Sequence, residues 1–172
     1  KIDLHVKDAI GRRWQLSTIQ IDFAQPTNFN LEYVSSENKK DKPVMIHRAL
    51  LGSIERFTGI LIEHYEGNFP EWLAPTQLKI VTIGNIDDYL TKVTSKLENV
   101  RYEIDDRNIR LGEKLHEAKK MKIPLTLIIG EKDVQNNTGS LNFISGESLD
   151  NEDLDKVVKK INKLTEEPRF TF

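Results

Sequence analysis

Residues 44–57 constrain the fold most, because the pattern of their side chains changes half-way along. Residues 44–49 read as a strand that places Val44, Ile46 and Arg48 on one face and the residues between them on the other. The pair Gly52-Ser53 interrupts this pattern, and Ser53 is a suitable N-cap for a helix. After it, apolar residues recur at helical steps of three and four, namely Ile54, Phe57, Leu61 and Tyr65. The stretch therefore predicts a strand that leads directly into a helix.

Arg56 falls in the first turn of this predicted helix. A cation there faces the positive end of the helix dipole, which costs a few tenths to about 1 kcal/mol. Either a carboxylate such as Glu55 neutralises the arginine, or the site concentrates positive charge for an anion. The residues themselves leave both explanations open.

Charge and cysteine content exclude several classes of protein. The chain has 25 basic and 27 acidic residues, a formal net charge of -2, so any nucleic-acid contact needs a local basic patch. It has no cysteine, which excludes disulfides and thiolate metal sites and fits a reducing compartment. No apolar run reaches the roughly 18 residues that span a membrane, and there is no signal peptide, so we expect a cytoplasmic protein without a membrane partner. Because Lys1 opens the chain within a strand-like pattern, we expect a piece of a longer protein.

Two alternating segments, residues 2–7 and 14–23, predict an antiparallel hairpin near the start of the chain. Its second strand has an apolar face with Ile19 and Ile21, which we expect to be buried, and a polar face. If the polar face lines a cleft, Gln15, Thr18 and Gln20 suit recognition of an adenosine or an amino group, since amides and hydroxyls both donate and accept. The alternative is that they are ordinary exposed strand residues.

Apolar strands alternate with amphipathic helices from residue 76 onward. This predicts a mixed sheet with helices on its faces. The final helix is expected to be capped by Asn151 or Asp150. The predicted order is β-α-β-α-β-β-α, with strands at 78–83, 100–104, 125–129 and 140–144 and helices at 87–97, 111–121 and 154–164. The region contains no nucleophile elbow, glycine-rich dinucleotide motif or histidine pair, so it reads as a ligand- or partner-binding domain.

The motif His-Arg-Ala-x-x-Gly-Ser-x-Glu-Arg-Phe, from His47 to Phe57, resembles the third signature motif of class II aminoacyl-tRNA synthetases, in its threonyl form. The segment Trp-Gln-x-x-Thr-Ile-Gln-x-Asp-Phe from Trp14, and Phe-Pro-x-Trp-Leu-Ala-Pro from Phe69, also resemble the threonyl-tRNA synthetase family. The resemblance covers nearly the whole chain. It implies an α/β (α+β) chain in two parts: residues 1–74, a partial antiparallel class II synthetase sheet with the motif 3 helix, and residues 75–172, a mixed-sheet α/β anticodon-binding domain.

The resemblance also implies roles for residues of the first part. Arg56 would clamp the triphosphate of ATP, which is bound with Mg²⁺, and Lys1 would face the same catalytic site. Gln15, Thr18, Gln20 and Ser53 would line the threonine and ATP site. His47 would be one of three Zn²⁺ ligands, and because the other two lie outside this chain, we expect zinc only in the full-length enzyme.

Two loops of the second part resemble anticodon-binding loops of the family, Asp-Asp-Arg-Asn from Asp105 and Gly-Glu-Lys-Asp from Gly130. Asn108 and Asp133 would read base edges, and Arg110 and Lys132 would contact bases or phosphates. A simple turn is the alternative for each loop. The family's arginines near residues 141–145 are absent, so either Asn142 substitutes or the contact is weaker. A basic side of the helix at 111–121, formed by Lys114, Lys119, Lys120 and Lys122, is either a phosphate-facing patch or ordinary surface charge.

The resemblance therefore implies a threonine–tRNA ligase, a homodimer at full length, whose partners are threonine, ATP and threonine tRNA. This chain would be inactive alone, because it lacks the first two class II motifs. The alternative is a non-catalytic RNA-binding or regulatory module in which the second part carries the function.

Overall fold

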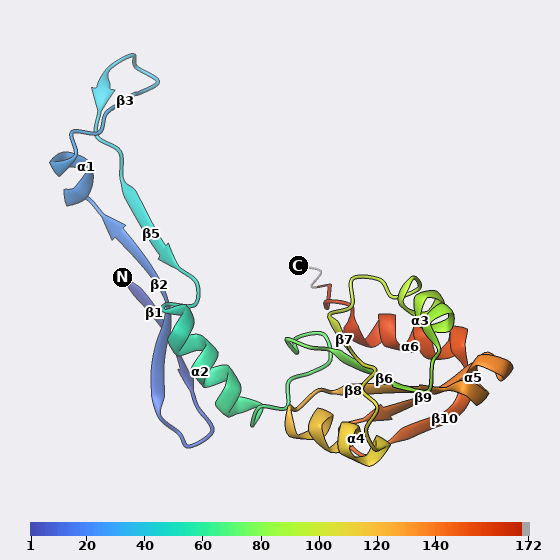
Figure 1. The fold of residues 1–172 in the computed structure, drawn as a ribbon. Coiled ribbons are helices and arrows are strands. Elements are labelled where there is room, and N and C mark those ends of the chain that lie inside the picture. Colours follow the sequence, from blue (N-terminus) through green and yellow to red (C-terminus); the bar gives the residue numbers. More distant parts are fainter. Residues whose placement is uncertain (170–172) are drawn as a thin grey trace. The chain divides into compact units, whose positions relative to one another are not determined.

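The structure is a computed structural model that describes residues 1–169. The chain divides into two compact units, the first of residues 1–66 and the second beginning at Gly67 (Figure 1). The expected boundary at residues 74 and 75 stays a prediction.

The first unit contains a three-stranded antiparallel sheet in the order β1-β2-β5, followed by a helix. Gly52, with φ +67°, makes the predicted transition from strand to helix, and a Cβ there would lie 2.8 Å from the carbonyl oxygen of Leu16, so a larger residue would clash with backbone. Ser53 is the N-cap, as predicted, and its hydroxyl accepts from the Arg56 amide. The elements are β1 (Ile2–Lys7), β2 (Arg13–Asp22), α1 (Ala24–Asn28), β3 (Tyr33–Val34), β4 (Lys40–Asp41), β5 (Met45–Ala49) and α2 (Ile54–His64).

The apolar face of this sheet is exposed, so the expectation of a buried face was wrong. Ile2, Ile21 and Ile46 are each about 60% exposed, at 60%, 59% and 66%. They share one face, because Ile2 pairs with Ile19 and Ile21 pairs with Ile46. The alternation was read correctly, but burial needs a second layer, and the described part of this unit supplies none over these three residues.

The second unit is a five-stranded mixed sheet in the order β10-β9-β8-β6-β7. The strands β7, β6 and β8 are parallel, and β9 and β10 are antiparallel to their neighbours. Figure 1 shows α3 and α6 on one side of the sheet and α4 on the other. The elements are β6 (Leu78–Ile83), α3 (Asp87–Thr94), β7 (Tyr102–Asp105), α4 (Leu111–Lys120), β8 (Leu125–Gly130), α5 (Glu131–Asn136), β9 (Thr138–Phe143), β10 (Ser148–Asp153) and α6 (Leu154–Thr165).

The main core lies between this sheet and the pair α3 and α6. Alternate residues of β6 and β8 point into it, among them Ile80 and Leu127, and they meet Val93 of α3 and Ile161 of α6. All four are fully excluded from solvent. The fold class inferred from alternating strands and helices is thereby confirmed.

Two elements of the second unit were missed. The turn expected after Gly130 is the short helix α5, and the expected cap region of the last helix is the strand β10. Because β10 occupies residues 148–153, the cap is Asp153, whose carboxylate accepts from the amides of Asp155 and Lys156, and the expectation of Asn151 or Asp150 was wrong.

Candidate functional site: a polar sheet face and a pocket at the strand ends

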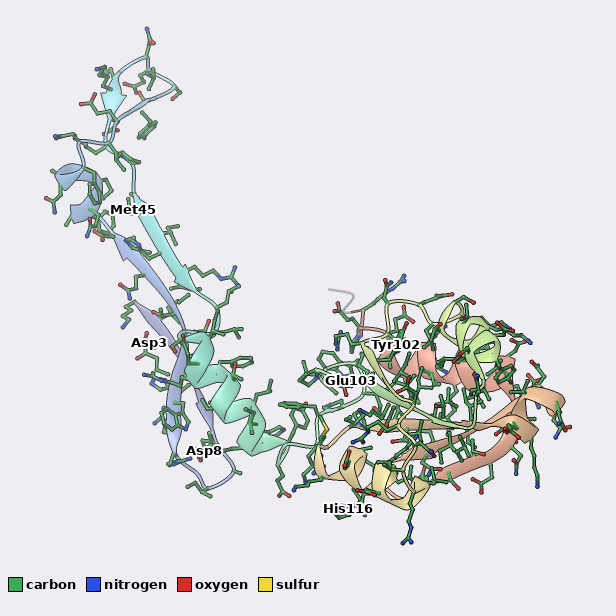
Figure 2. The ribbon with its side chains drawn as sticks, viewed as in Figure 1. Asp3, Asp8, Met45, Tyr102, Glu103 and His116 are labelled. Carbon is green, nitrogen blue, oxygen red and sulfur yellow. The ribbon has the colours of Figure 1, made fainter. Side chains whose placement is uncertain are left out.

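Predicted site residues of the first unit gather on one face of its sheet around Asp3, which the sequence analysis did not single out. The Gln15 side-chain amide donates to Asp3 Oδ1 at 2.7 Å, and Lys1 Nζ lies 3.3 Å from the same oxygen. Thr18 is the cross-strand partner of Asp3. Burial acts to raise the pKa of the Asp3 carboxyl, but Thr18 and Lys1 outweigh it and lower the pKa. Figure 2 labels Asp3 on β1 and Asp8 at the turn that follows.

His47 lies on the same face, opposite Gln20 across the β2–β5 ladder. Its Nε2 lies 3.1 Å from Asp22 Oδ2. The backbone amide of Gln25 is the main cause of a lowered Asp22 pKa, with a smaller contribution from His47. Among residues 1–169, no three His, Cys, Asp or Glu side chains converge on a point that could hold a metal ion. These described residues therefore do not make a zinc site by themselves.

Arg56 extends from the first turn of α2 without a carboxylate partner among the described residues. Glu55 accepts instead from the hydroxyl of Ser53 at 2.6 Å, so it takes part in the local capping of α2 and does not neutralise the arginine. The Arg56 guanidinium carbon lies 5.8 Å from the centre of the Trp14 ring. A cation stacked on an aromatic face keeps its N–H groups available. The arrangement leaves Arg56 able to bind an anion.

Trp14 is itself held by Asp8. The indole N–H donates to Asp8 Oδ2 at 2.9 Å, and Arg12 also pairs with this carboxylate. Burial raises the pKa of Asp8, but the hydrogen bonds from Trp14 and Arg12 outweigh it and lower the pKa to about 2. Asp8 therefore stays ionised and fixes the ring on which Arg56 lies.

In the second unit, a cavity of about 470 Å³ opens at the carboxyl ends of β6 and β7. Asn108 lines it, as do Lys114 and two residues that the sequence analysis had not assigned to a binding site, Thr82 and Asn85. Ligands of open α/β sheets bind outside the carboxyl ends of the strands, so this is the expected place for a ligand. The strand order also reverses here, since β7 and β8 flank β6 on opposite sides.

Asp133, Arg110 and Lys132 lie in loops or helix starts at the same edge of the sheet. Asp133 accepts from the Gly130 amide at 2.9 Å and from Thr138 Oγ1 at 2.7 Å. One carboxylate oxygen thus holds the start of α5 and the other holds the start of β9, a structural role that the sequence analysis missed. Arg110 is the N-cap of α4, and Lys132 lies in the first turn of α5; both are exposed.

The structure does not bring Asn142 to this cavity. Asn142 pairs with Thr126 across the β8–β9 ladder, four residues from the end of β8 at Gly130, which is roughly 13 Å along a strand. It lines a separate pocket of about 150 Å³ with Leu115 and Lys119 of α4.

The predicted basic side of the helix at 111–121 needs one correction. Lys114 is only 2% exposed, so it does not contribute to a surface patch. Lys119, Lys120 and Lys122 are exposed, as expected of a charged surface. The pattern misled because a lysine can enter the interior when its ammonium finds acceptors there.

The two units of the chain match the models of two families of synthetase domains. The chain belongs to the anticodon binding domain family, which matches residues 77–164. Residues 1–65 match the tRNA synthetase class II core domain (G, H, P, S and T). No helix in the described part of the chain is long and apolar enough to cross a membrane.

Among curated proteins the chain is similar to threonine–tRNA ligases. It is 47% identical to that of Clostridium tetani over 165 residues, which are 94% of this chain and 26% of the relative. It is 45% identical to that of Caldanaerobacter subterraneus subsp. tengcongensis over 166 residues, 95% of this chain and 26% of the relative. The resemblance to threonyl-tRNA synthetases is thereby confirmed, and the chain spans about a quarter of the length of these relatives.

Two solved structures of threonyl-tRNA synthetases are also similar to this chain. The RNA binding domain of threonyl-tRNA synthetase from Cryptosporidium parvum Iowa II has a TM-score of 0.79 and 31% identity, covering 94% of this chain and 42% of that one. A putative threonyl-tRNA synthetase from Aeropyrum pernix has a TM-score of 0.60 and 26% identity, covering 95% and 41%.

Proposed function

We propose that this chain is the part of a threonine–tRNA ligase that recognises the anticodon of threonine tRNA and completes the ATP and threonine site. The cavity at the carboxyl ends of β6 and β7, with Asn108 in its wall, is the observation that carries the first half of this proposal. Unpaired anticodon bases are read through polar side chains that contact their exposed edges. Arg110, Lys132 and Asp133 lie at the start of helices on this edge, where Arg110 and Lys132 are free to contact phosphates. In this proposal any contact between Asn142 and the RNA is made outside this cavity, because Asn142 lines a separate pocket.

Binding of anticodon stem-loops to the whole chain tests this half. We expect a preference for the threonine anticodon over a version with altered bases, at two salt concentrations. Asn108→Ala removes a base-edge contact, so it should reduce that preference by roughly five- to a hundredfold. The control is Asn68→Ala, because Asn68 is an exposed residue of the α2–β6 connection, without a positive φ, and has no assigned contact to RNA. Equal, salt-sensitive binding of both stem-loops would mean contact with phosphates only and would contradict base recognition.

The second half rests on the polar sheet face. Lys1, Gln15 and Thr18 cluster around Asp3, and Gln20 lies beside them. Ser53 caps the helix that carries Arg56, whose free guanidinium suits the triphosphate of ATP bound with Mg²⁺. His47 would complete a Zn²⁺ site only with ligands from elsewhere in a full-length, homodimeric enzyme. That enzyme would work in the cytoplasm.

The chain alone should not activate threonine, because activation also needs groups from the rest of a class II core. We therefore expect no threonine-dependent exchange of pyrophosphate into ATP by this chain. Exchange above the background of an Arg56→Ala variant would contradict this prediction. The same assay on the chain joined to the missing part of a relative should recover activity that depends on Arg56.

A further inference from the structure

A buried lysine ties together the two strand ends beneath the cavity. The Lys114 ammonium, carried by α4, donates to the carbonyl oxygen of Thr82 at 2.9 Å and to that of Asp105 at 3.1 Å. Thr82 lies next to the end of β6, and Asp105 is the last residue of β7. Lysine is almost never fully buried unless its charge is paired. Its charge partner is the Asp105 carboxylate, whose Oδ1 lies 4.0 Å away.

Asp105 extends this anchor to the loop that follows. Its carboxylate accepts two hydrogen bonds from the Arg107 guanidinium, at 2.9 and 2.7 Å, and Arg107 also pairs with Glu117 of α4. Lys114, Asp105, Arg107 and Glu117 thus form a chain of alternating charge with no net charge, which we call the anchor cluster. Breaking such a chain at a buried member leaves an uncompensated charge, so its members depend on one another.

The anchor cluster borders the cavity that is lined by Asn108, the residue proposed to read a base. Asn108 follows Arg107 in sequence, and Lys114, Arg107 and Asn108 all line the same cavity. A loop that is already ordered binds more tightly than one that must be ordered on binding. The cluster fixes both the backbone before Asn108, through Arg107, and part of the cavity wall, through Lys114.

We propose that Lys114 and Asp105 are positioning residues that hold the loop with Asn108 in its binding conformation and so determine anticodon preference. This inference rests on the proposed anticodon recognition. According to this inference, the preference for the threonine anticodon depends on a buried lysine that does not itself contact a base.

The test measures binding of two stem-loops, one with the threonine anticodon and one with altered bases, to whole-chain variants that circular dichroism shows to be folded. For Lys114→Met we expect the ratio of the two affinities to fall about tenfold, the fold-change of one lost base contact. Affinity for the altered stem-loop should stay unchanged, because its phosphate contacts are intact. The matched control is Ala118→Gly, a buried position one turn further along α4 that weakens the helix without touching the cluster.

Loss of stability alone would lower both affinities together and would act equally in the control. The proposal is overturned if Lys114→Met keeps the wild-type ratio, or if Ala118→Gly loses as much of it. If Lys114→Met does not fold, Glu117→Gln is tested in its place. Glu117 is partly exposed, and its substitution removes one partner of Arg107. An unchanged ratio of affinities in Glu117→Gln overturns the proposal. A wild-type chain with no preference would instead overturn anticodon recognition itself.

Discussion

At the scale of single residues, Asp105 shows how the fold gives one carboxylate both burial and a charge. It is 3% exposed, and the hydrogen bonds from Arg107 lower its pKa to about 2 despite the opposing effect of burial. The sequence indicated that residues 105–108 form either a simple turn or a binding loop. It could not decide between these two alternatives, because Lys114 and Glu117, the partners that hold this segment, are six to twelve residues away on a helix. A buried ion pair is a property of the packed structure.

The pH dependence of stability should report this carboxylate. Its pKa in the folded chain lies below the usual value of 3.8, so its stabilising effect is complete above about pH 4 and is lost as the pH falls towards 2. The displacement corresponds to about 2 kcal/mol. We expect the free energy of unfolding of Asp105→Asn, measured by urea denaturation, to lose about 2 kcal/mol less than wild type between pH 5 and pH 2.

Trp14→Phe provides a clean background for this measurement, because Trp72 of the second unit is then the only tryptophan. The control is Asp106→Asn, the exposed neighbour, which should follow the wild-type pH dependence. Parallel curves for Asp105→Asn and wild type would contradict a lowered pKa.

At the scale of elements, periodicity predicted the strands and helices that have a strong pattern and missed those that depend on pairing. The helix α2 and its cap Ser53 were predicted, since an N-cap and a helical period are local properties. The strand β10 was missed because it is mostly polar, with the sequence Ser-Leu-Asp-Asn-Glu-Asp. Its hydrogen bonds to β9 make it a strand. No local signal in the sequence indicates that pairing.

The exposed face of the first sheet predicts self-association of the isolated chain. Ile21 and Ile46 are cross-strand neighbours and more than half exposed, and exposed apolar faces with open edges associate. We expect the double variant Ile21→Thr and Ile46→Thr to remain monomeric at concentrations where the wild type associates, because threonine keeps the strand propensity but adds polarity.

Sedimentation velocity over a concentration series measures this effect. The control is Val134→Thr, an exposed apolar position on α5 of the second unit, which should associate like the wild type. A wild-type chain that stays monomeric throughout the series would contradict the prediction.

At the scale of the whole molecule, the two units differ in what stabilises them. The main core runs from Leu78 to Ile161 and lies within the second unit. Gln77 is fully buried next to this core, and its side chain bonds to three backbone groups. It donates to the carbonyl oxygens of Trp72 and Thr165 and accepts from the Arg101 amide. The second unit therefore has the core and the satisfied polar groups of an independent domain.

A chain that begins at Gly67 should fold alone. Because it retains the whole core and Gln77 with its partners, we expect its free energy of unfolding to match that of the whole chain within about 0.5 kcal/mol. Trp72 fluorescence during urea unfolding measures this, with the whole chain compared in the Trp14→Phe background. A shift of several kcal/mol would show that the first unit contributes to the stability of the second.

The alternating elements, the fold class and the family resemblance could be predicted from the amino-acid sequence, because they depend on local period and on motifs such as His-Arg-Ala-x-x-Gly-Ser. Which groups contact one another became visible only in the folded chain. The tertiary structure placed Asp3 among the predicted binding residues, buried Lys114 in the wall of the cavity that Asn108 also lines, used Asp133 as a helix cap and separated Asn142 from that cavity. The reason is physical: burial, pKa and contact depend on neighbours distant in sequence, and one strand register or helix rotation decides whether the same residue faces water, a ligand or the core.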